Sequence, residues 1–304
     1  MDFQLILDEI NDELRPQLAT AGGKVASYIP ALARVSPLQF GIALRTCAGE
    51  TAAAGDSAVP FSIQSMSKVF SLTLAIRALG EAMWDRIGRE PSGSAFNSLV
   101  QLETERGIPR NPFINAGAIA VADRLVSQGD AKAELLALLG RLCGEPVFID
   151  AEVARSEADT GFRNTALANF MKAFGTLDND VATVLDVYFN QCAIAMSCEQ
   201  MACAAGYLCR DGQHPLAGTP VLSPAQARRV NALMLTCGTY DAAGEFAFRI
   251  GLPCKSGVGG GIVAVVPDHL SLCVWSPALD GTGNSLLGRR ALELFVAKTG
   301  LSVF

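Results

Sequence analysis

The hydrophobic pattern of the N-terminal third of this chain changes from helical to extended spacing. Residues 1–18 place apolar residues at helical intervals between acidic ones, which predicts an amphipathic helix. Residues 39–46 and 58–63 then predict two short strands, with a turn region over residues 48–56 between them. The chain therefore opens with one helix and the beginning of a sheet.

From Ser65 to about residue 230 the spacing is helical. Ser197 and Ser223 are each followed three residues later by glutamine, which is the pattern of an N-terminal capping box. Gly175 and Gly238 follow helical runs, where glycine is the preferred C-terminal cap. The middle of the chain is predicted to be entirely helical.

Strand character returns near the C-terminus. Residues 255–266 and 270–275 predict two strands joined by a turn, and residues 285–298 predict a closing helix. We therefore expect a mixed α/β (α+β) fold, in which residues 1–64 and 231–304 form an antiparallel-sheet lobe with flanking helices. Residues 65–230 form a helical lobe inserted between these two segments, and the cleft between the lobes is where a site is expected.

Composition narrows the classes of partner. The 304 residues include 24 Lys and Arg against 30 Asp and Glu, a net charge of −6, which argues against nucleic acid or an anionic membrane as partner. Residues 192–209 are apolar apart from Glu199, but their many small side chains favour a helix buried in protein over one in lipid. The first residues lack the features of an export signal, so a cytoplasmic location is expected.

Cysteine and histidine usage points away from metal chemistry. The nine cysteines show no Cys-x-x-Cys spacing, so neither a disulfide framework nor a zinc site is expected, and the thiols are predicted to be reduced. The only histidines, His214 and His269, lack a second ligand at metal-binding spacing. We expect no metal and no cofactor.

The first candidate for chemistry is the pair Ser65 and Lys68. Residues three apart on a helix are neighbours on one face, and a hydroxyl at a helix N-terminus meets unpaired backbone N–H groups. A desolvated lysine beside it loses its proton more easily and can act as a base toward the serine. The alternative is that Ser65 only caps the helix and Lys68 extends to solvent.

The second candidate is the glycine-rich segment that begins at Lys255. Serine acyl-enzymes with a Ser-x-x-Lys motif carry a later Lys-Ser/Thr-Gly strand opposite the nucleophile, and residues 255–257 match it. The match at residues 298–300 is better explained as the end of a helix. The bare glycines let a substrate approach the backbone, so the N–H groups of Val258 and Ser65 are our candidate oxyanion hole. The alternative is a bulged core strand.

With these residues in view, the chain resembles the serine-dependent glutaminases, whose fold is similar to that of the serine β-lactamases and penicillin-binding transpeptidases. Eight segments carry the resemblance, in order along the chain. They are GKVASYIPALA at 23–33, IQSMSKVF at 63–70, EPSGSAFNS at 90–98, NPFINAGAI at 111–119, SEADTGFRNTALA at 156–168, VYFNQCAI at 187–194, CGTYD at 237–241 and KSGVGGGI at 255–262.

The resemblance implies an amidohydrolase that converts L-glutamine to L-glutamate and ammonia through a glutamyl ester on Ser65. It also implies a homo-oligomer, with a tetramer as the expected form. The substrate contacts that it implies are Ser65, Asn115, Glu157, Asn164, Tyr188, Tyr240 and Val258.

The residue types at these positions suit a free amino acid. A carboxylate such as Glu157 can bind the ammonium group, and the amides of Asn115 and Asn164 can donate to the carboxylate. Each position also has a structural interpretation on its own. Glu157 would be a first-turn helix acid and Asn115 a helix cap, and the tyrosines would be ordinary packing residues.

The expected mechanism assigns Lys68 as the base for Ser65. Tyr240 then passes a proton to the departing ammonia, and the charge of Lys255 lowers the pKa of Tyr240. The sequence allows Lys68 and Tyr240 to exchange these roles.

Two other functions compete with glutamine hydrolysis. One is a penicillin-recognising type of serine acyl-hydrolase that acts on another amide. The Ser-x-Asn element of those enzymes is not evident in the sequence, and residues 188–190 resemble the Tyr-x-Asn variant only weakly. The other is a glutamine-binding protein without catalysis, although Ser65, Lys68, Tyr240 and Lys255 are all present.

Overall fold

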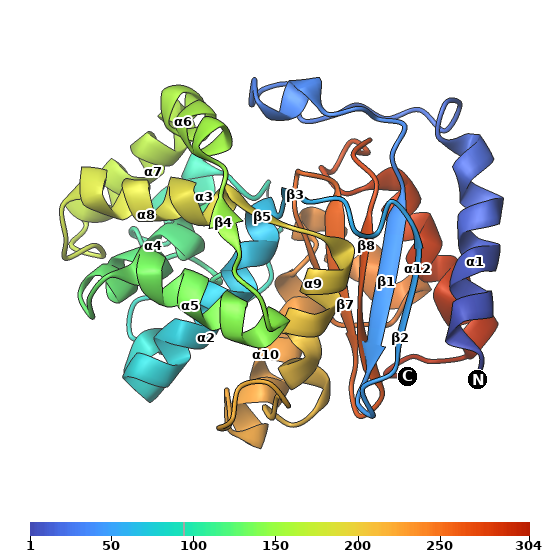
Figure 1. The fold of residues 1–304 in the computed structure, drawn as a ribbon. Helices are drawn as coiled ribbons and strands as arrows, with labels where there is room; N and C mark the ends of the chain where they lie inside the picture. The colour runs from blue at the N-terminus through green and yellow to red at the C-terminus, as the bar shows by residue number, and fades with distance from the viewer. Residues whose placement is uncertain (94) are drawn as a thin grey trace.

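The computed structural model describes residues 1–93 and 95–304, and within them it combines helices with two antiparallel sheets. The larger sheet has the strand order β2-β1-β8-β7-β6 (Figure 1). Its strands are β1 (Gly41–Thr46), β2 (Thr51–Gly55), β6 (Cys254–Ser256), β7 (Gly261–Val266) and β8 (Leu270–Trp275). Both ends of the chain contribute to this sheet, as the sequence predicts.

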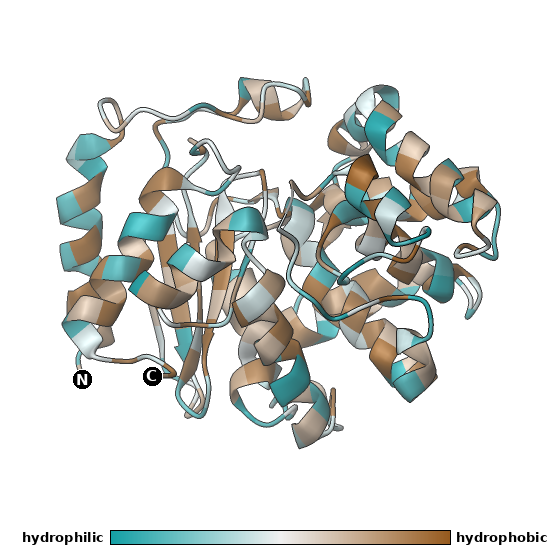
Figure 2. Ribbon diagram, turned by 180° about the vertical axis from the view of Figure 1, so that it is seen from behind, coloured by the Kyte–Doolittle hydropathy of each residue, from teal (hydrophilic) through white to brown (hydrophobic). Residues whose placement is uncertain are grey.

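The side chains of the central strands are buried on both faces of this sheet. Ile42 and Leu44 of β1 belong to the core on one face, whereas Ala43 belongs to the core on the other. Strands β7 and β8 are buried at every position, which explains their continuous apolar runs. Figure 2 shows these strands as mainly hydrophobic, with alternating hydrophilic and hydrophobic residues along the outer helices.

The outer face of the sheet is covered by the two terminal helices, α1 (Phe3–Leu14) and α12 (Leu286–Thr299), with α11 (Ala243–Arg249) beside them. The buried residues of α1 are Leu7, Ile10 and Leu14, a single stripe at helical spacing. Pro16 follows in a short 3-10 turn, so the predicted helix over residues 1–18 is confirmed but ends at Leu14.

The inner face is covered by α9 (Cys198–Ala204), a 3-10 segment (Ala205–Cys209) and α10 (Pro224–Cys237). The prediction that residues 192–209 form one helix is wrong, although their burial is confirmed. Helix α8 ends at Cys192, and a strand intervenes before Ser197 starts α9 through both bonds of its capping box.

A second group of helices packs beside the sheet (Figure 1). They are α2 (Ser67–Leu79), α3 (Leu99–Thr104), α4 (Asn115–Val126), α5 (Ala131–Cys143), α6 (Ala151–Thr160), α7 (Phe162–Ala173) and α8 (Val181–Cys192). The middle of the chain is not entirely helical, because β3 (Phe61–Ser62), β4 (Phe148–Ile149) and β5 (Ile194–Met196) form a small sheet in the order β3-β5-β4. These strands have only two or three residues each, which is too few to produce a recognisable strand period in the sequence.

Two strand predictions need correction. The predicted turn over residues 48–56 contains β2, whose Ala52 and Ala54 are buried on the face that packs against α1. Alanine has a low strand propensity, so pairing with β1 decides the structure here. The predicted strand over residues 58–63 shrinks to β3, which pairs with β5 and not with the larger sheet.

The predicted strand over residues 255–266 is interrupted by a turn at residues 257–260, between β6 and β7. This turn packs against the chain that leads into Ser65. A Cβ atom added to Gly257 would lie 2.6 Å from the carbonyl oxygen of Ile63, and one added to Gly259 would lie 2.2 Å from that of Ser62. Only glycine allows the two backbones to approach this closely.

Residues 18–40 leave α1 and cross the top of the molecule toward α6 before they enter β1 (Figure 1). The N–H of Ala31 donates to Ser156 Oγ at 3.2 Å, and Arg34 forms an ion pair with Glu152. We call residues 23–35 the strap. The division into lobes at residues 64/65 and 230/231 stays a prediction; α9 and α10, from the middle segment and its end, pack directly on the sheet.

Candidate active site

Ser65 lies where the strap, the turn at residues 257–260 and α2 meet. We call this turn the glycine turn. It belongs to a 3-10 turn (Gln64–Met66) that precedes α2, and its side chain is buried. A Cβ atom added to Gly257 would lie 3.2 Å from the backbone nitrogen of Ser65, so the glycine turn stands directly against the nucleophile candidate. The N-cap of α2 is Met66 and has no side-chain capping bond, so Ser65 is not a helix cap.

Two residues beside Ser65 hold an unusual backbone conformation. Gln64 has φ 49° and Tyr240 has φ 60°, in the left-handed region that side-chain-bearing residues rarely adopt. Each such residue costs on the order of 1 kcal/mol or more and persists only where the surrounding structure enforces it. Strain of this kind concentrates at functional sites.

Lys68 is buried, with 1% of its surface exposed, so the alternative in which it extends to solvent is wrong. Its Nζ donates to the carbonyl oxygen of Phe113 at 3.1 Å and to Asn115 Oδ1 at 2.8 Å. Burial lowers the pKa of Lys68 to about 8. About a tenth of this amine is therefore neutral at pH 7.

The two acceptors of Lys68 are held by the start of α4. The side-chain oxygen of Asn111 accepts hydrogen bonds from the N–H groups of Phe113 and Ile114 at 3.0 and 3.1 Å. A Cβ atom added to Gly117 would lie 1.8 Å from the carbonyl oxygen of Asn111, so glycine is required for this turn to lie on α4. Ile114 is the N-cap of α4, so the interpretation of Asn115 as a cap is wrong.

Tyr240 lies on the other side of Ser65. Its hydroxyl donates to the carbonyl oxygen of Ser256 at 3.3 Å and is hydrogen-bonded to Ser65. Burial raises the pKa of Tyr240 to about 12, and the hydrogen bonds to Ser65 and Ser256 only partly oppose this shift. The phenol therefore stays protonated at neutral pH.

The role predicted for Lys255, a charge that lowers the pKa of Tyr240, stays a prediction. Lys255 Nζ lies 4.5 Å from the centroid of the Tyr240 ring but donates to the carbonyl oxygens of Gly238 and Ser256 at 2.9 and 2.6 Å. Its side chain is fully buried, and burial lowers its own pKa well below the usual value. The pKa of Tyr240 is raised overall, because its own burial is the largest cause of the shift.

A cavity of about 110 Å³, which we call the Ser65 cavity, opens beside the serine. It brings together six of the residues that the sequence predicts as substrate contacts. They are Ser65, Asn115, Glu157, Asn164, Tyr188 and Val258. Tyr240 does not line the cavity but is hydrogen-bonded to Ser65. The structure therefore places all seven predicted contacts around one serine.

Glu157 forms the acidic end of the Ser65 cavity. It lies in the second half of α6, so the interpretation as a first-turn acid is wrong. Burial raises the pKa of Glu157 to about 7, against the opposing effects of a hydrogen bond from Gln64 and of the charge of Lys68. A cation bound in the cavity would restore the ionised form of this carboxyl.

The two asparagines are connected to Lys68. Asn115 Nδ2 donates to Asn164 Oδ1 at 2.9 Å, while Asn115 Oδ1 accepts from Lys68. Asn115 therefore accepts a hydrogen bond from Lys68 and also lines the cavity. Asn164 also lines the Ser65 cavity, and its side-chain amide nitrogen is a hydrogen-bond donor.

The structure adds residues that the sequence analysis missed. Tyr28 of the strap, Gln64 and Cys192 also line the Ser65 cavity. Tyr28 and Cys192 fall inside segments that resemble the family, but only the folded chain brings them to the serine. The weak Tyr-x-Asn match fails, because Asn190 Nδ2 donates to the backbone and side chain of Asp186 within α8.

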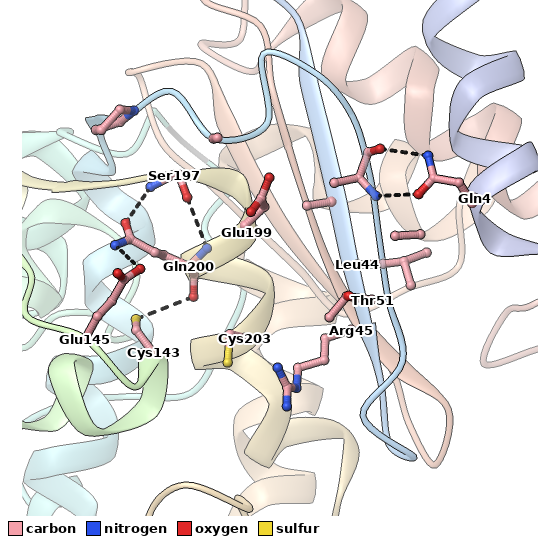
Figure 3. Close-up of a pocket in the computed structure, with 15 residues that line it drawn as sticks. Gln4, Leu44, Arg45, Thr51, Cys143, Glu145, Ser197, Glu199, Gln200 and Cys203 are labelled. Carbon is pink, nitrogen blue, oxygen red and sulfur yellow. Dashed lines mark hydrogen bonds between the residues drawn. The ribbon is translucent and has the colours of Figure 1, made fainter.

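A larger cavity, of about 620 Å³, lies elsewhere and contains none of the predicted residues (Figure 3). We call it the β2 cavity, because it runs between β2 and α9. Figure 3 shows Gln4 facing β2, where its amide donates to the carbonyl oxygen of Ala53 at 2.9 Å and accepts from the Ala53 N–H at 3.2 Å. Gln4 thus pairs with the open edge of the sheet like a short strand.

Among residues 1–93 and 95–304, no three His, Cys, Asp or Glu side chains are grouped so that they could hold a metal ion. Over the same part of the chain, no helix has both the length and the apolar character that a membrane span requires. Ser94, inside the motif at 90–98, lies outside the described residues.

Helices beside an antiparallel sheet, with a buried Ser-x-x-Lys pair at their junction, define a protein of the β-lactamase-like fold. Comparison with known proteins gives the family. A glutaminase family model matches residues 23–304. The glutaminase of Rhizobium rhizogenes (strain K84) is 58% identical over 308 residues, which cover 100% of this chain and 99% of that protein. The thermolabile glutaminase of Rhizobium etli is 56% identical, with coverages of 100% and 99%.

Solved structures agree with this result. The probable glutaminase ybaS superposes with a TM-score of 0.92 at 37% identity, covering 99% of this chain and 98% of that one. A probable glutaminase from Bacillus subtilis, complexed with 6-diazo-5-oxo-L-norleucine, gives a TM-score of 0.89 at 36% identity, with coverages of 100% and 97%. The chain belongs to the glutaminase family, and the predicted family and fold class are confirmed.

Proposed function

We propose that this chain hydrolyses L-glutamine to L-glutamate and ammonia, with Ser65 as the nucleophile. The observation that carries the proposal is the Ser65 cavity itself. Ser65 stands three residues before a buried lysine with a lowered pKa and is hydrogen-bonded to a buried tyrosine, and its cavity is lined by a carboxyl group and amide side chains. Family membership supports the same substrate.

The size and polarity of the Ser65 cavity suit a free amino acid. Its volume of about 110 Å³ is well below the roughly 300–1,000 Å³ typical of sites for larger ligands, which favours glutamine over a peptide or a β-lactam. Glu157 binds the ammonium group and, once ionised, forms a charge-assisted hydrogen bond with it. The amide of Asn164 donates to the substrate carboxylate.

In the acylation step, Ser65 Oγ attacks the side-chain amide carbon while its proton moves to Lys68. The backbone N–H groups of Ser65 and Val258 hold the developing oxyanion; loss of one such donor typically costs about 3 kcal/mol. The C–N bond then breaks, and Tyr240 gives its proton to the departing ammonia and regains one from Lys68. Water hydrolyses the glutamyl ester by the reverse proton path.

The pKa values support this division between the two candidate bases. With a pKa of about 8, Lys68 has a neutral form available to accept the serine proton. With a pKa of about 12, Tyr240 is a poor base at neutral pH but a competent donor. We therefore assign Lys68 as the base and Tyr240 as the relay.

The test compares ammonia release from L-glutamine by the wild-type chain and by Ser65→Ala. We expect release by the wild type alone, and a mass adduct of 6-diazo-5-oxo-L-norleucine on the wild type but not on the variant. Wild-type release no greater than that of Ser65→Ala would instead indicate a binding protein without catalysis. A β-lactam adduct on Ser65 together with no glutamine turnover would favour the other acyl-hydrolase.

Two further proposals concern the quaternary state and the location of the protein in the cell. We propose a homo-oligomer, a tetramer, on the family resemblance alone. We also propose a cytoplasmic location, since all nine cysteines are free thiols, as is typical of a reducing compartment. Light scattering coupled to size-exclusion chromatography tests the first proposal, and fractionation of the source cells tests the second.

A further inference from the structure

Two cysteine side chains meet at the edge of the larger sheet. Cys47 follows β1 in the turn that leads to β2, and Cys209 ends the 3-10 segment that packs on the inner face of the sheet. The thiol of Cys47 donates to the sulfur of Cys209 at 3.4 Å and to its carbonyl oxygen at 3.2 Å. The two residues are 162 positions apart in the sequence, so only the fold brings their sulfur atoms together.

The backbones of both cysteines are held by the turn between β7 and β8. The N–H of Cys47 donates to the carbonyl oxygen of His269 at 2.7 Å. The N–H of Asp268 donates to the carbonyl oxygen of Cys209 at 3.0 Å. The guanidinium of Arg210 also donates to the carbonyl oxygen of Cys47. These bonds fix the two backbones relative to each other, so the contact between the thiols is part of the folded structure.

The two sulfur atoms are close to bonding distance. A disulfide bond is about 2.05 Å long, so the sulfurs, which lie 3.4 Å apart, need to approach by roughly 1.4 Å. Shared between two side chains, this movement leaves each of them within its staggered rotamer. The pair can therefore be bridged while both backbones keep their hydrogen bonds to the turn between β7 and β8.

The two thiols differ in their access to solvent. Cys209 is 2% exposed, and burial raises the pKa of its thiol, so it is protected from an oxidant in solution. Cys47 is only half-buried. A small oxidant in solution therefore reaches Cys47 first, and the thiol that can complete a disulfide bond is already in contact with it.

We propose that Cys47 and Cys209 form an oxidation site, at which a peroxide converts the two thiols into a disulfide bond. In a reducing compartment the pair stays in the thiol form, and the bond forms only when peroxide is present. The inference goes beyond the proposed reaction at Ser65 and does not rest on it. It assigns to this pair a control over the stability of the chain.

The oxidation balances with one molecule of hydrogen peroxide. The sulfur of Cys47 attacks a peroxide oxygen, the O–O bond breaks, and the second oxygen leaves as water with the thiol proton, which gives a sulfenic acid. The sulfur of Cys209 then attacks the sulfur of Cys47. The S–S bond forms, the S–O bond breaks, and the hydroxyl group leaves as water with the Cys209 proton. The two thiols lose two electrons in total, and the peroxide is reduced to two water molecules.

This pair lies at the end of the sheet opposite to Ser65. Gly41 of β1 pairs with Trp275, which also pairs with Gly261 directly after the glycine turn. The six residues of β1 span roughly 17 Å from there to the turn that holds Cys47. Figure 1 shows this turn at the end of the sheet away from the strap. We therefore expect the disulfide bond to leave the active site unchanged.

The disulfide bond would instead act on unfolding. It closes a loop over residues 47–209, which includes Ser65, Lys68 and Glu157. A crosslink across so long a loop removes many conformations from the unfolded chain, so it favours the folded state. Oxidised protein is therefore expected to resist heat better than reduced protein.

The experiment compares reduced protein with protein treated with hydrogen peroxide. Free thiols are alkylated, and peptides are analysed by mass spectrometry without reduction. We expect a crosslink between Cys47 and Cys209 that dithiothreitol reverses. The midpoint of thermal unfolding should rise by about 5 °C or more on oxidation, while the kcat for glutamine stays within about twofold. The crosslink and the midpoint are measured without substrate, so the result is independent of the proposed function.

Variants assign the effect to this pair. Cys47→Ser changes a half-buried position and should abolish both the crosslink and the rise in the unfolding midpoint. Cys143→Ser is the matched control, because Cys143 is also half-buried but donates to the carbonyl oxygen of Gln200 at 3.6 Å. It should keep both effects. Cys209→Ala tests the order of the steps, since Cys47 should then stop at the sulfenic acid, which dimedone traps.

Three results would overturn the proposal. In the first, peroxide leaves Cys209 as a free thiol in the wild-type chain. In the second, the crosslink joins other cysteines, or Cys47→Ser keeps the rise in the unfolding midpoint. In the third, the crosslink forms between Cys47 and Cys209 but the midpoint does not rise.

Discussion

The Ser65 cavity and the β2 cavity differ in size and in the state of their charged groups. The β2 cavity is the larger, at about 620 Å³ against about 110 Å³, yet its Glu145 and Glu199 are exposed to solvent. They accept hydrogen bonds from Gln200 and Ser57, respectively. In the Ser65 cavity, Glu157 is 6% exposed, and Lys68 behind it is 1% exposed.

This difference teaches that desolvation, and not volume, marks the chemical site. Burial disfavours the charged form of each group, so it lowers the pKa of Lys68 to about 8 and raises that of Glu157 to about 7. A pKa near the working pH is what the proposed role of Lys68 as a general base requires. Side chains that stay in contact with water are not subject to this desolvation.

The largest expected effect is the removal of the buried base. Lys68→Met should lower kcat for glutamine by about 10²–10⁴-fold, the usual contribution of a general base. The control is Lys132→Met, because Lys132 forms an ion pair with Asp186 on an exposed surface. Near-normal turnover by Lys68→Met would show that another group accepts the serine proton.

The next effect is the loss of the buried carboxyl. Glu157→Gln removes the charge that binds the substrate ammonium, and a charge-assisted hydrogen bond is worth about 1.5–3 kcal/mol. We therefore expect kcat/KM to fall by about 10–150-fold, mainly through KM. Glu199→Gln in the β2 cavity is the matched control. If the two variants behaved alike, the contrast between the cavities would have no functional meaning.

A pH profile sharpens the comparison without a mutation. Lys68 must lose its proton to act as a base, so kcat/KM should fall by up to about tenfold per pH unit as the pH drops below about 8. Protonation of Glu157, with its pKa of about 7, should steepen the fall in the same direction. Activity that rose as the pH fell from 8 to 6 would contradict the assigned protonation states.

The smallest effect on catalysis is expected in the β2 cavity. Gln4→Ala removes the two hydrogen bonds that cover the edge of β2, so the free energy of unfolding should fall by about 1–2 kcal/mol. The kcat for glutamine should stay within about twofold of the wild type. Urea denaturation and an ammonia assay measure the two quantities. A large loss of activity in a folded variant would make this cavity functional after all.

The parts of this fold that could be predicted from the sequence are those whose pattern is local. The strand over residues 270–275 and the helix over residues 285–298 were predicted to within a residue. The Ser65 and Lys68 pair was also readable, because its spacing lies within one helical turn. β2 was not, because its alanines have a low strand propensity and only pairing with β1 makes them a strand. The strand predicted over residues 58–63 was too long, because only the two residues of β3 find a partner, in the distant β5.

The chain's own residues thus determined the family motifs, the serine and lysine one turn apart, and the glycines that face them. Only the tertiary structure decided which groups lose contact with water. It buried Lys68, Lys255 and Glu157, and it placed Tyr28 at the cavity. The physical reason is the distance along the chain over which each effect acts. Helical and strand periods arise between near neighbours, whereas desolvation depends on every segment that packs around a group.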